Sequence, residues 1–307
     1  MSGRSDRRCD VVVVGSVNRD YVCSSDRLPA SGETVLGGEV TVGSGGKGGN
    51  QAVSAAYWGA TTAIVGCVGG DADGEALRAD LEAAGVDTSA LTVLSDVRTG
   101  CAFVFVAPDG ENAIVVAPGA NGRVDPANVH AATRRLLRPG GVVVTQAEIP
   151  APAAAAGVAA AAEIGARAIV NLAPYRNTEA GLLQLADPLV VNESEAAGLL
   201  GSRIEDVAEA RAAAQELARR TRSVVITLGP SGAVLADGVE TLHVPAEERA
   251  AVDTTGAGDA FTGVVAAALA GGDDLATAVR WGVAAGTYAV GGHGAQASFP
   301  RRADIAG

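Results

Sequence analysis

Two aspartates frame a run of small residues in the segment Asp253-Thr254-Thr255-Gly256-Ala257-Gly258-Asp259. The apolar residues that follow, up to Gly271-Gly272, are typical of a helix that stops at glycine. The first amides of a helix lack internal partners, and small residues let a ligand approach them, so the segment could bind an anion. Asp259 could then be a general base for a hydroxyl that attacks a phosphoryl group, or simply a carboxylate that complements the helix dipole.

A second glycine-rich segment, Gly43-Ser44-Gly45-Gly46-Lys47-Gly48-Gly49-Asn50, contains the only lysine of the chain. Lys47 among glycines could contact a polar ligand at close range, or the segment could be a flexible turn. The segment lacks the spacing of a Walker A loop, but its GxGxxG spacing also occurs in NAD-dependent dehydrogenases. That reading is weakened because the nearest suitable acid, Asp71, falls in a turn at 69–74.

Polar residues also follow the first predicted strand, at 11–14. Asn18 and Asp20 would share one side of an extended chain, and Glu148 could join them. Paired acceptors and donors of this kind suit a polyhydroxylated ligand.

Two later strand ends carry further candidates. After a strand at 189–191, Asn192 and Glu195 could form a helix cap with a first-turn acid, or could supply oxygen ligands for hydrated Mg²⁺. A strand at 224–227 runs into a glycine turn that could line a nucleotide pocket or be an ordinary turn.

The elements that would position these residues alternate along the chain. Short β-branched runs predict strands at 11–14, 63–65, 142–145, 168–171, 189–191 and 224–227. Between them, Ala/Leu-rich stretches predict helices at 75–84, 126–137, 152–164 and 206–221. This alternation favours a Rossmann-like α/β fold, with a doubly wound, mostly parallel sheet, helices on both faces and ligands at the carboxyl ends of the strands.

Segments 33–42 and 98–116 break the alternation and predict additional β-structure. We therefore expect a single domain over 1–307, with a small β lid formed by about 18–45 and 98–118.

Composition limits the classes of function. The chain has 307 residues, 48% of them hydrophobic, so a sizeable core rather than disorder is expected. The net charge of −12 argues against general binding to nucleic acid or to an anionic membrane. The four cysteines are scattered, and no apolar run is long enough for a signal peptide or a membrane span, so a cytoplasmic protein is expected.

In chain order these motifs resemble the ribokinase family of carbohydrate kinases. The resemblance covers nearly the whole chain, and its most specific part is the pair formed by Gly45–Ala52 and Asp253–Asp259. It implies a β lid that often forms a homodimer interface, and transfer of the ATP γ-phosphoryl group to the primary hydroxyl of ribose. It also implies Mg²⁺ and an activating K⁺.

The resemblance also assigns roles by position. Asp259 matches the general base, and the amides of Gly256, Ala257 and Gly258 match the anion hole. The sugar-binding positions are Asn18, Asp20, Gly46, Lys47, Gly48, Gly49, Asn50, Glu148 and Asp259. The nucleotide-binding positions are Asn192, Thr227, Leu228, Gly229, Pro230, Ser231, Gly232, Gly258 and Val283. Glu195 matches the acid that binds Mg²⁺ through water. The K⁺ positions are Asp253, Thr255, Ala289, Gly292, Gly294 and Ser298.

The chain departs from the family pattern in places. Gly49 replaces a usual alanine, and Val283 replaces a polar residue that often contacts the nucleotide, which weakens the expectation of strict ATP specificity. Other readings remain open: a family member acting on another small sugar, a sugar acid or a nucleoside, or, more remotely, a dehydrogenase or a non-catalytic sugar-binding protein.

Overall fold

The computed structural model describes residues 8–108, 112–176 and 180–305. Its main sheet is built from β1 (Cys9–Val14), β4 (Thr62–Gly69), β5 (Val86–Leu94), β8 (Leu137–Gln146), β9 (Arg167–Asn171), β10 (Leu189–Asn192), β11 (Val224–Thr227), β12 (Ala233–Ala236) and β13 (Thr241–Val244). The strand order is β13-β12-β11-β10-β9-β8-β1-β4-β5. Neighbours from β11 to β5 are parallel, whereas β12 and β13 are antiparallel additions at one edge.

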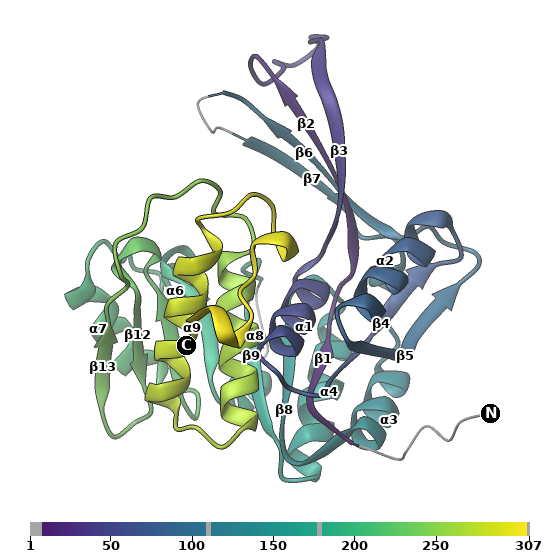
Figure 1. Ribbon diagram of the computed structural model, residues 1–307. Coiled ribbons are helices and arrows are strands. Elements are labelled where there is room, and N and C mark those ends of the chain that lie inside the picture. The colour runs from purple at the N-terminus through teal and green to yellow at the C-terminus, as the bar shows by residue number, and fades with distance from the viewer. Residues whose placement is uncertain (1–7, 109–111, 177–179, 306–307) are drawn as a thin grey trace.

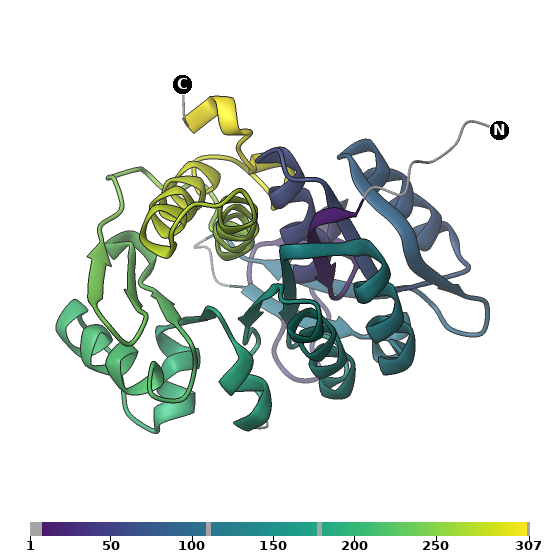
Figure 2. The ribbon, with the colours of Figure 1, turned by 90° about the horizontal axis from the view of Figure 1, so that it is seen from below.

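Helices cover both faces of this sheet (Figures 1 and 2). One face packs against α1 (Lys47–Tyr57), α2 (Ala72–Ala83), α8 (Ala257–Ala270) and α9 (Leu275–Ala289). The other packs against α3 (Pro126–Leu136), α4 (Ala151–Glu163), α5 (Ala180–Leu185), α6 (Glu193–Leu200) and α7 (Val207–Leu217). A short α10 (Arg302–Ile305) follows. Alternate side chains of β1 enter the two cores, because side chains along a strand point to opposite faces.

A second sheet projects from this body (Figure 1). It has the order β3-β2-β6-β7, with β2 (Asn18–Ser25), β3 (Gly37–Gly45), β6 (Gly100–Val106) and β7 (Asn112–Ala117). Exposed apolar side chains gather on it: Val40, Val42, Phe103, Phe105, Ile114, Val115 and Val116. Residues 109–111, within the expected lid segment 98–118, lie outside the described residues.

The predicted fold class is confirmed, and each of the six predicted strands is present. The sequence patterns missed β5, β12 and β13, and they placed a glycine-rich loop where α1 begins. Within the described ranges, no helix combines the length and apolarity needed to cross a bilayer.

Candidate functional site

The start of α1 packs closely against the turn after β1. The N–H of Gly49 donates to the carbonyl of Ser16 over 2.9 Å, and a Cβ on Gly48 would lie 2.6 Å from the Ser16 backbone. Gly46, with φ of 82°, lies against the backbone of Asn18. Only glycine fits these close approaches. They bring Lys47 and Asn50 to the ends of the central strands.

Gly49 itself is not under this constraint. A Cβ there would have its nearest neighbours at 3.8 Å, which is ordinary contact, so the departure from the usual alanine changes little in the packing.

The GxGxxG spacing does not have dehydrogenase geometry. Its first two glycines lie in β3, a strand of the second sheet, while α1 leads into β4 of the main sheet. Asp71 is the N-cap of α2 and accepts hydrogen bonds from Gly74 and Thr99.

Asp259 lies in the first turn of α8, only 6% exposed. Its Oδ2 accepts a hydrogen bond from Asn50 Nδ2 at 2.9 Å, and its Oδ1 accepts one from Gln51 Nε2 at 2.8 Å. The N-cap residue of α8 is Gly256, with φ of 79° and no side-chain cap, and the space beside Gly258 is open. The start of the helix is therefore accessible to an anion. Of the three expected amides, that of Ala257 already donates to the Thr254 carbonyl over 3.3 Å.

Glu148 holds the same region from the end of β8. Its Oε2 accepts hydrogen bonds from Ser16 Oγ at 2.6 Å and from the Lys47 amide at 3.1 Å. Asn18 is buried, and its Oδ1 accepts a hydrogen bond from Asn121 Nδ2 at 2.7 Å. The predicted sugar-side residues thus converge from β2, α1, β8 and α8.

Carboxylates outnumber positive charges in this cluster. The Asp259 carboxylate raises the pKa of Lys47 above its ordinary value against the effect of burial, and Glu148 and Glu195 add to the rise. Burial, with Glu148 and Asp259 nearby, raises the pKa of Asp20 from 3.8 to about 6. Asp20 Oδ1 is buried without a hydrogen-bond partner among the described residues. A ligand that donates hydrogen bonds would satisfy this carboxylate.

Because of this environment, we expect ionised Asp20 to lower the free energy of unfolding by an amount that depends on pH. Because its folded pKa lies above the unfolded value, its ionisation opposes folding, and its contribution to the free energy of unfolding falls as pH rises from 3.8 to about 6. We expect Asp20→Asn to raise the free energy of unfolding at pH 7 by about 1–3 kcal/mol, and the difference from the wild type to grow over that window. Urea denaturation between pH 4 and 7 measures this. The exposed Asp96→Asn variant is the control, and a less stable Asp20→Asn protein at pH 7 would contradict the assignment.

Asn192 and Glu195 form a capping box at the start of α6. Asn192 Oδ1 accepts from the Glu195 amide at 2.8 Å, and Glu195 Oε2 accepts from the Asn192 amide at 2.9 Å. Burial raises the pKa of Glu195 against the effects of this hydrogen bond and of Lys47. The cap uses one carboxylate oxygen of Glu195, and the charges of Lys47 and Asp259 both act on the pKa of this carboxyl group.

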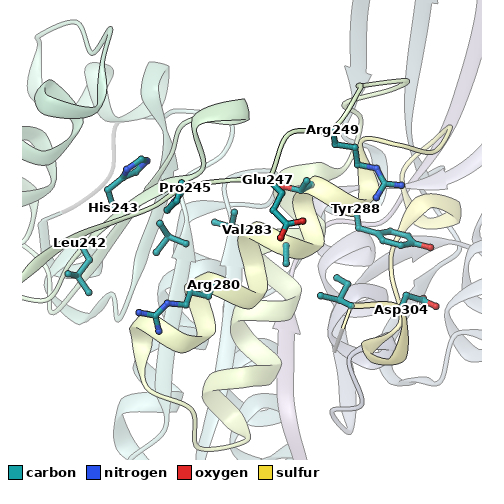
Figure 3. Close-up of a pocket in the computed structure, with 13 residues that line it drawn as sticks. Leu242, His243, Pro245, Glu247, Arg249, Arg280, Val283, Tyr288 and Asp304 are labelled. Atoms are coloured by element: carbon teal, nitrogen blue, oxygen red, sulfur yellow. The ribbon is translucent and has the colours of Figure 1, made fainter. Parts of the chain in front are cut away.

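A cavity of about 540 Å³ lies close to the turn after β11. Arg280, Val283 and Tyr288 of α9 line one side, and the segment from Leu242 to Arg249 lines the other (Figure 3). His243 Nε2 lies 2.7 Å from the Ser231 carbonyl, which connects this wall to the turn 227–232. Thr227 pairs with Asn192 across β10 and β11. The cavity therefore adjoins the predicted nucleotide-binding residues, whereas Asp259 is not part of its lining.

The six predicted K⁺ positions lie at the end of α9, in the loop before α8 and in the segment that follows α9. Asp253 accepts hydrogen bonds from the amides of Thr255 and Gly294, each at 2.9 Å, and these outweigh burial and lower its pKa. Ser298 Oγ donates to the Gly294 carbonyl at 2.8 Å, and the Gly292 amide donates to the Ala289 carbonyl at 3.1 Å. Across the part of the chain that the structure describes, no cluster of three or more His, Cys, Asp or Glu residues could hold a metal ion.

Several site residues were not predicted. Gln51, Gln146, Asn171 and Gln296 form an amide network behind Asn50 and Asp259. Gln51 and Gln146 adjoin predicted motifs, but uncharged amides at distant positions carry no spacing signal of their own.

Comparisons with known proteins identify the family of this chain. The model of the pfkB family carbohydrate kinases matches residues 9–302. A Haemophilus influenzae ribokinase is 34% identical over 300 residues, 96% of each chain, and a Mus musculus ribokinase is 36% identical over 96% of this chain and 93% of its own.

Solved structures agree in fold as well. The Arabidopsis thaliana ribokinase complexed with ribose and ATP has a TM-score of 0.89 at 29% identity, covering 98% of both chains. A Thermotoga maritima ribokinase has a TM-score of 0.87 at 31% identity, covering 96% of this chain and 97% of its own. This chain is therefore a member of the pfkB family of carbohydrate kinases.

Proposed function

We propose that this chain transfers the γ-phosphoryl group of ATP to the primary hydroxyl of D-ribose and forms D-ribose 5-phosphate. The observation that carries the proposal is the position of Asp259 at the uncapped start of α8, where it is hydrogen-bonded to Asn50 of α1 and acts electrostatically on Lys47 and Asp20. The ribokinases described above share this chain's full length and fold.

In this mechanism Asp259 accepts the proton of the sugar hydroxyl. The hydroxyl oxygen forms a bond to the γ-phosphorus, the bond from that phosphorus to the bridging oxygen breaks, and ADP leaves with the electron pair. The amides of Gly256, Ala257 and Gly258 face the charge that develops on the transferred group, the amide of Ala257 by giving up its long bond to Thr254. Lys47 adds a positive charge from α1.

Sugar binding is assigned to the residues around the start of α1. Asn18, Asp20 and Glu148 would accept hydrogen bonds from sugar hydroxyls, and Asn50 would donate or accept beside Asp259. The segment Gly46–Gly49 brings the backbone close to the sugar. The unpartnered oxygen of Asp20 fits this role, because a hydroxyl donor would supply the hydrogen bond that it lacks.

The nucleotide would lie along the edge formed by Asn192, the turn 227–232 and the cavity beside Val283. The wall formed by Val283 is apolar, so it can pack against a purine ring but offers it no hydrogen bond. We propose ATP as the donor, with weak discrimination among purine bases.

The oxygen-bearing residues fit the two ions that we propose, Mg²⁺ and an activating K⁺. Magnesium, when bound, neutralises charge on the phosphates, and the Glu195 oxygen that the cap leaves free would hold its hydration water. Asp253, Thr255, Ala289, Gly292, Gly294 and Ser298 would supply oxygen atoms, several of them backbone carbonyls, to K⁺. A hard monovalent cation prefers oxygen ligands, and the loops that carry these residues are held together by the hydrogen bonds described above.

The second sheet supports a proposal for the oligomeric state. We propose a single domain over 1–307, with 18–45 and 98–118 as the lid, acting in the cytoplasm as a homodimer through the lid. Its exposed apolar side chains support this contact. In analytical ultracentrifugation, the Ile114→Asp/Val115→Asp variant should be monomeric, while Val93→Asp, at a half-exposed position of β5, should stay dimeric. A wild-type monomer at micromolar concentration would contradict the dimer.

A coupled assay that detects ADP tests the function. The values of kcat/KM are compared across ribose, 2-deoxyribose, fructose, ketodeoxygluconate, adenosine and pseudouridine, with ATP or GTP and with or without K⁺ and Mg²⁺. The proposal expects ribose to give the highest value, and a value for another acceptor well above that for ribose would replace the substrate. Absence of turnover with every acceptor would favour a sugar-binding protein.

A further inference from the structure

Behind the proposed base lies a buried network of side-chain amides. Gln51, on α1, is fully buried and donates through Nε2 to Asp259 Oδ1 at 2.8 Å and to Asn171 Oδ1 at 2.9 Å. Gln146 Nε2 donates to Gln51 Oε1 at 2.6 Å. Asn171 Nδ2 donates to the Val190 carbonyl at 3.1 Å. The network joins α1, α8 and the ends of β8, β9 and β10.

The two acceptors at the ends of the network determine the direction of each hydrogen bond within it. The Asp259 carboxylate and the Val190 carbonyl can only accept, so Gln51 must present its N–H group to Asp259, and Asn171 must present its carbonyl oxygen to Gln51. Gln51 Oε1 is then left to accept from Gln146. Because every amide orientation is fixed, Gln51 cannot turn away from Asp259 without leaving buried groups unpaired.

The backbone holds Gln51 at this distance. A Cβ on Gly263, one turn after Asp259, would lie 2.6 Å from the Gln51 carbonyl oxygen and 2.5 Å from Ser54 Cβ, so α1 and α8 are in close contact there. Ser54 Oγ also donates to the Ala260 carbonyl at 2.8 Å. This contact sets the distance between α1 and α8, and the hydrogen bond from Gln51 sets the orientation of the Asp259 carboxylate.

We infer that Gln51 is a positioning residue, which holds the Asp259 carboxylate in the orientation that receives the proton, with Gln146 and Asn171 fixing its amide. This inference rests on the proposed role of Asp259 as base. Oδ1 is occupied by Gln51, so Oδ2 is the oxygen that becomes available when Asn50 turns to the sugar. Without Gln51 the carboxylate rotates, and its protonated form is favoured because a buried carboxylate has lost a donor.

The charged groups that face Asp259 are Lys47 from α1, Asp20 from β2 and Glu195 from α6, and Glu148 faces Lys47 and Asp20. They remain in every variant below, so a difference in pH profile between variants reports on the amide network.

The test uses full-length protein and steady-state kinetics with ATP and the acceptor that gives the highest kcat/KM. Gln51→Met keeps the length of the side chain and removes its hydrogen bonds. We expect kcat at pH 7 to fall about 10- to 100-fold, both KM values to stay within about threefold, and the acid limb of the kcat profile to move up by about one pH unit. Gln146→Met should shift the profile in the same direction by a smaller amount. The matched control is Ser54→Ala, which removes a buried hydrogen bond between the same two helices and should keep the wild-type profile.

A loss of kcat in Gln51→Met that is equal at every pH, or an unchanged kcat, would overturn the inference and leave Gln51 with a structural role. If Gln51→Met does not fold, the Gln146→Met profile decides: a shifted acid limb supports the inference, and a wild-type profile overturns it. An active Asp259→Asn enzyme would remove the base itself and this inference with it. An inactive Asp259→Asn enzyme beside a wild-type Gln51→Met profile would remove the inference alone.

Discussion

Replacing Asp259 with asparagine is expected to lower kcat by about 10²- to 10⁴-fold, the range typical of a lost general base. KM for the sugar and for the nucleotide should change little, because asparagine keeps the shape of the side chain and still meets Asn50. The effect belongs to the transfer step, so single-turnover rates should fall as steeply as kcat. Rapid-quench measurement of product from prebound substrates makes that comparison.

The competing explanation is a carboxylate that only complements the dipole of α8. It predicts a loss of about 0.3–1 kcal/mol in the free energy of unfolding with turnover intact. Asp274→Asn is the matched control, because Asp274 caps the adjacent α9 through the Thr277 amide and lies outside the site. Asp259→Asn with near-normal turnover and a stability change like that of the control would refute the base.

The sequence was most informative where local pattern and tertiary role agree. The central strands are continuous β-branched runs because they are buried on both faces, and each was predicted. β5 was missed because it lies at the edge of the sheet and is partly exposed, so its apolar pattern is broken. The short β12 and β13 gave too few residues for a periodic signal.

The start of α1 could not be predicted from the sequence. Gly48 and Gly49 disfavour helix, so the segment was predicted as a glycine-rich loop or turn. The helix begins there because Gly48 allows close contact with Ser16, which lies 32 residues earlier. Tertiary packing overrides local propensity at this point, and only a structure shows it.

Some residues of the site could be predicted from the sequence and others could not. Asn50 was identified through the family resemblance, whereas Lys47 and Asp259 belong to motifs and could be identified by type and spacing. The amide network could not, because Gln51 and Asn171 are 120 positions apart and neither is charged. The sequence predicted either a cap or a Mg²⁺ site at Asn192 and Glu195. The structure shows the cap in full, and the cap uses only Oε2 of Glu195, so the two roles are compatible.

The second large effect is expected at Lys47, which faces Asp259, Glu148 and Glu195 together. Lys47→Met removes the positive charge from this group of acids. We expect kcat to fall about 10²- to 10³-fold, because the charge developing on the transferred phosphoryl group loses its ammonium partner and the charged groups described above around Asp259 are then all carboxylates. Steady-state kinetics across pH 6 to 9 measures this.

The variant should also be less stable in the absence of substrates. A raised lysine pKa means that the ammonium form is favoured in the folded protein, so its contribution is present at neutral pH and is lost only as pH rises through the folded pKa. Lys47→Arg, which keeps the charge, should retain most of the stability and regain only part of kcat, because the planar guanidinium cannot reproduce the point charge of lysine. If Lys47→Met kept wild-type turnover, Lys47 would have no part in the transfer step. If the variant lost stability but not kcat, Lys47 would serve only to neutralise the surrounding carboxylates.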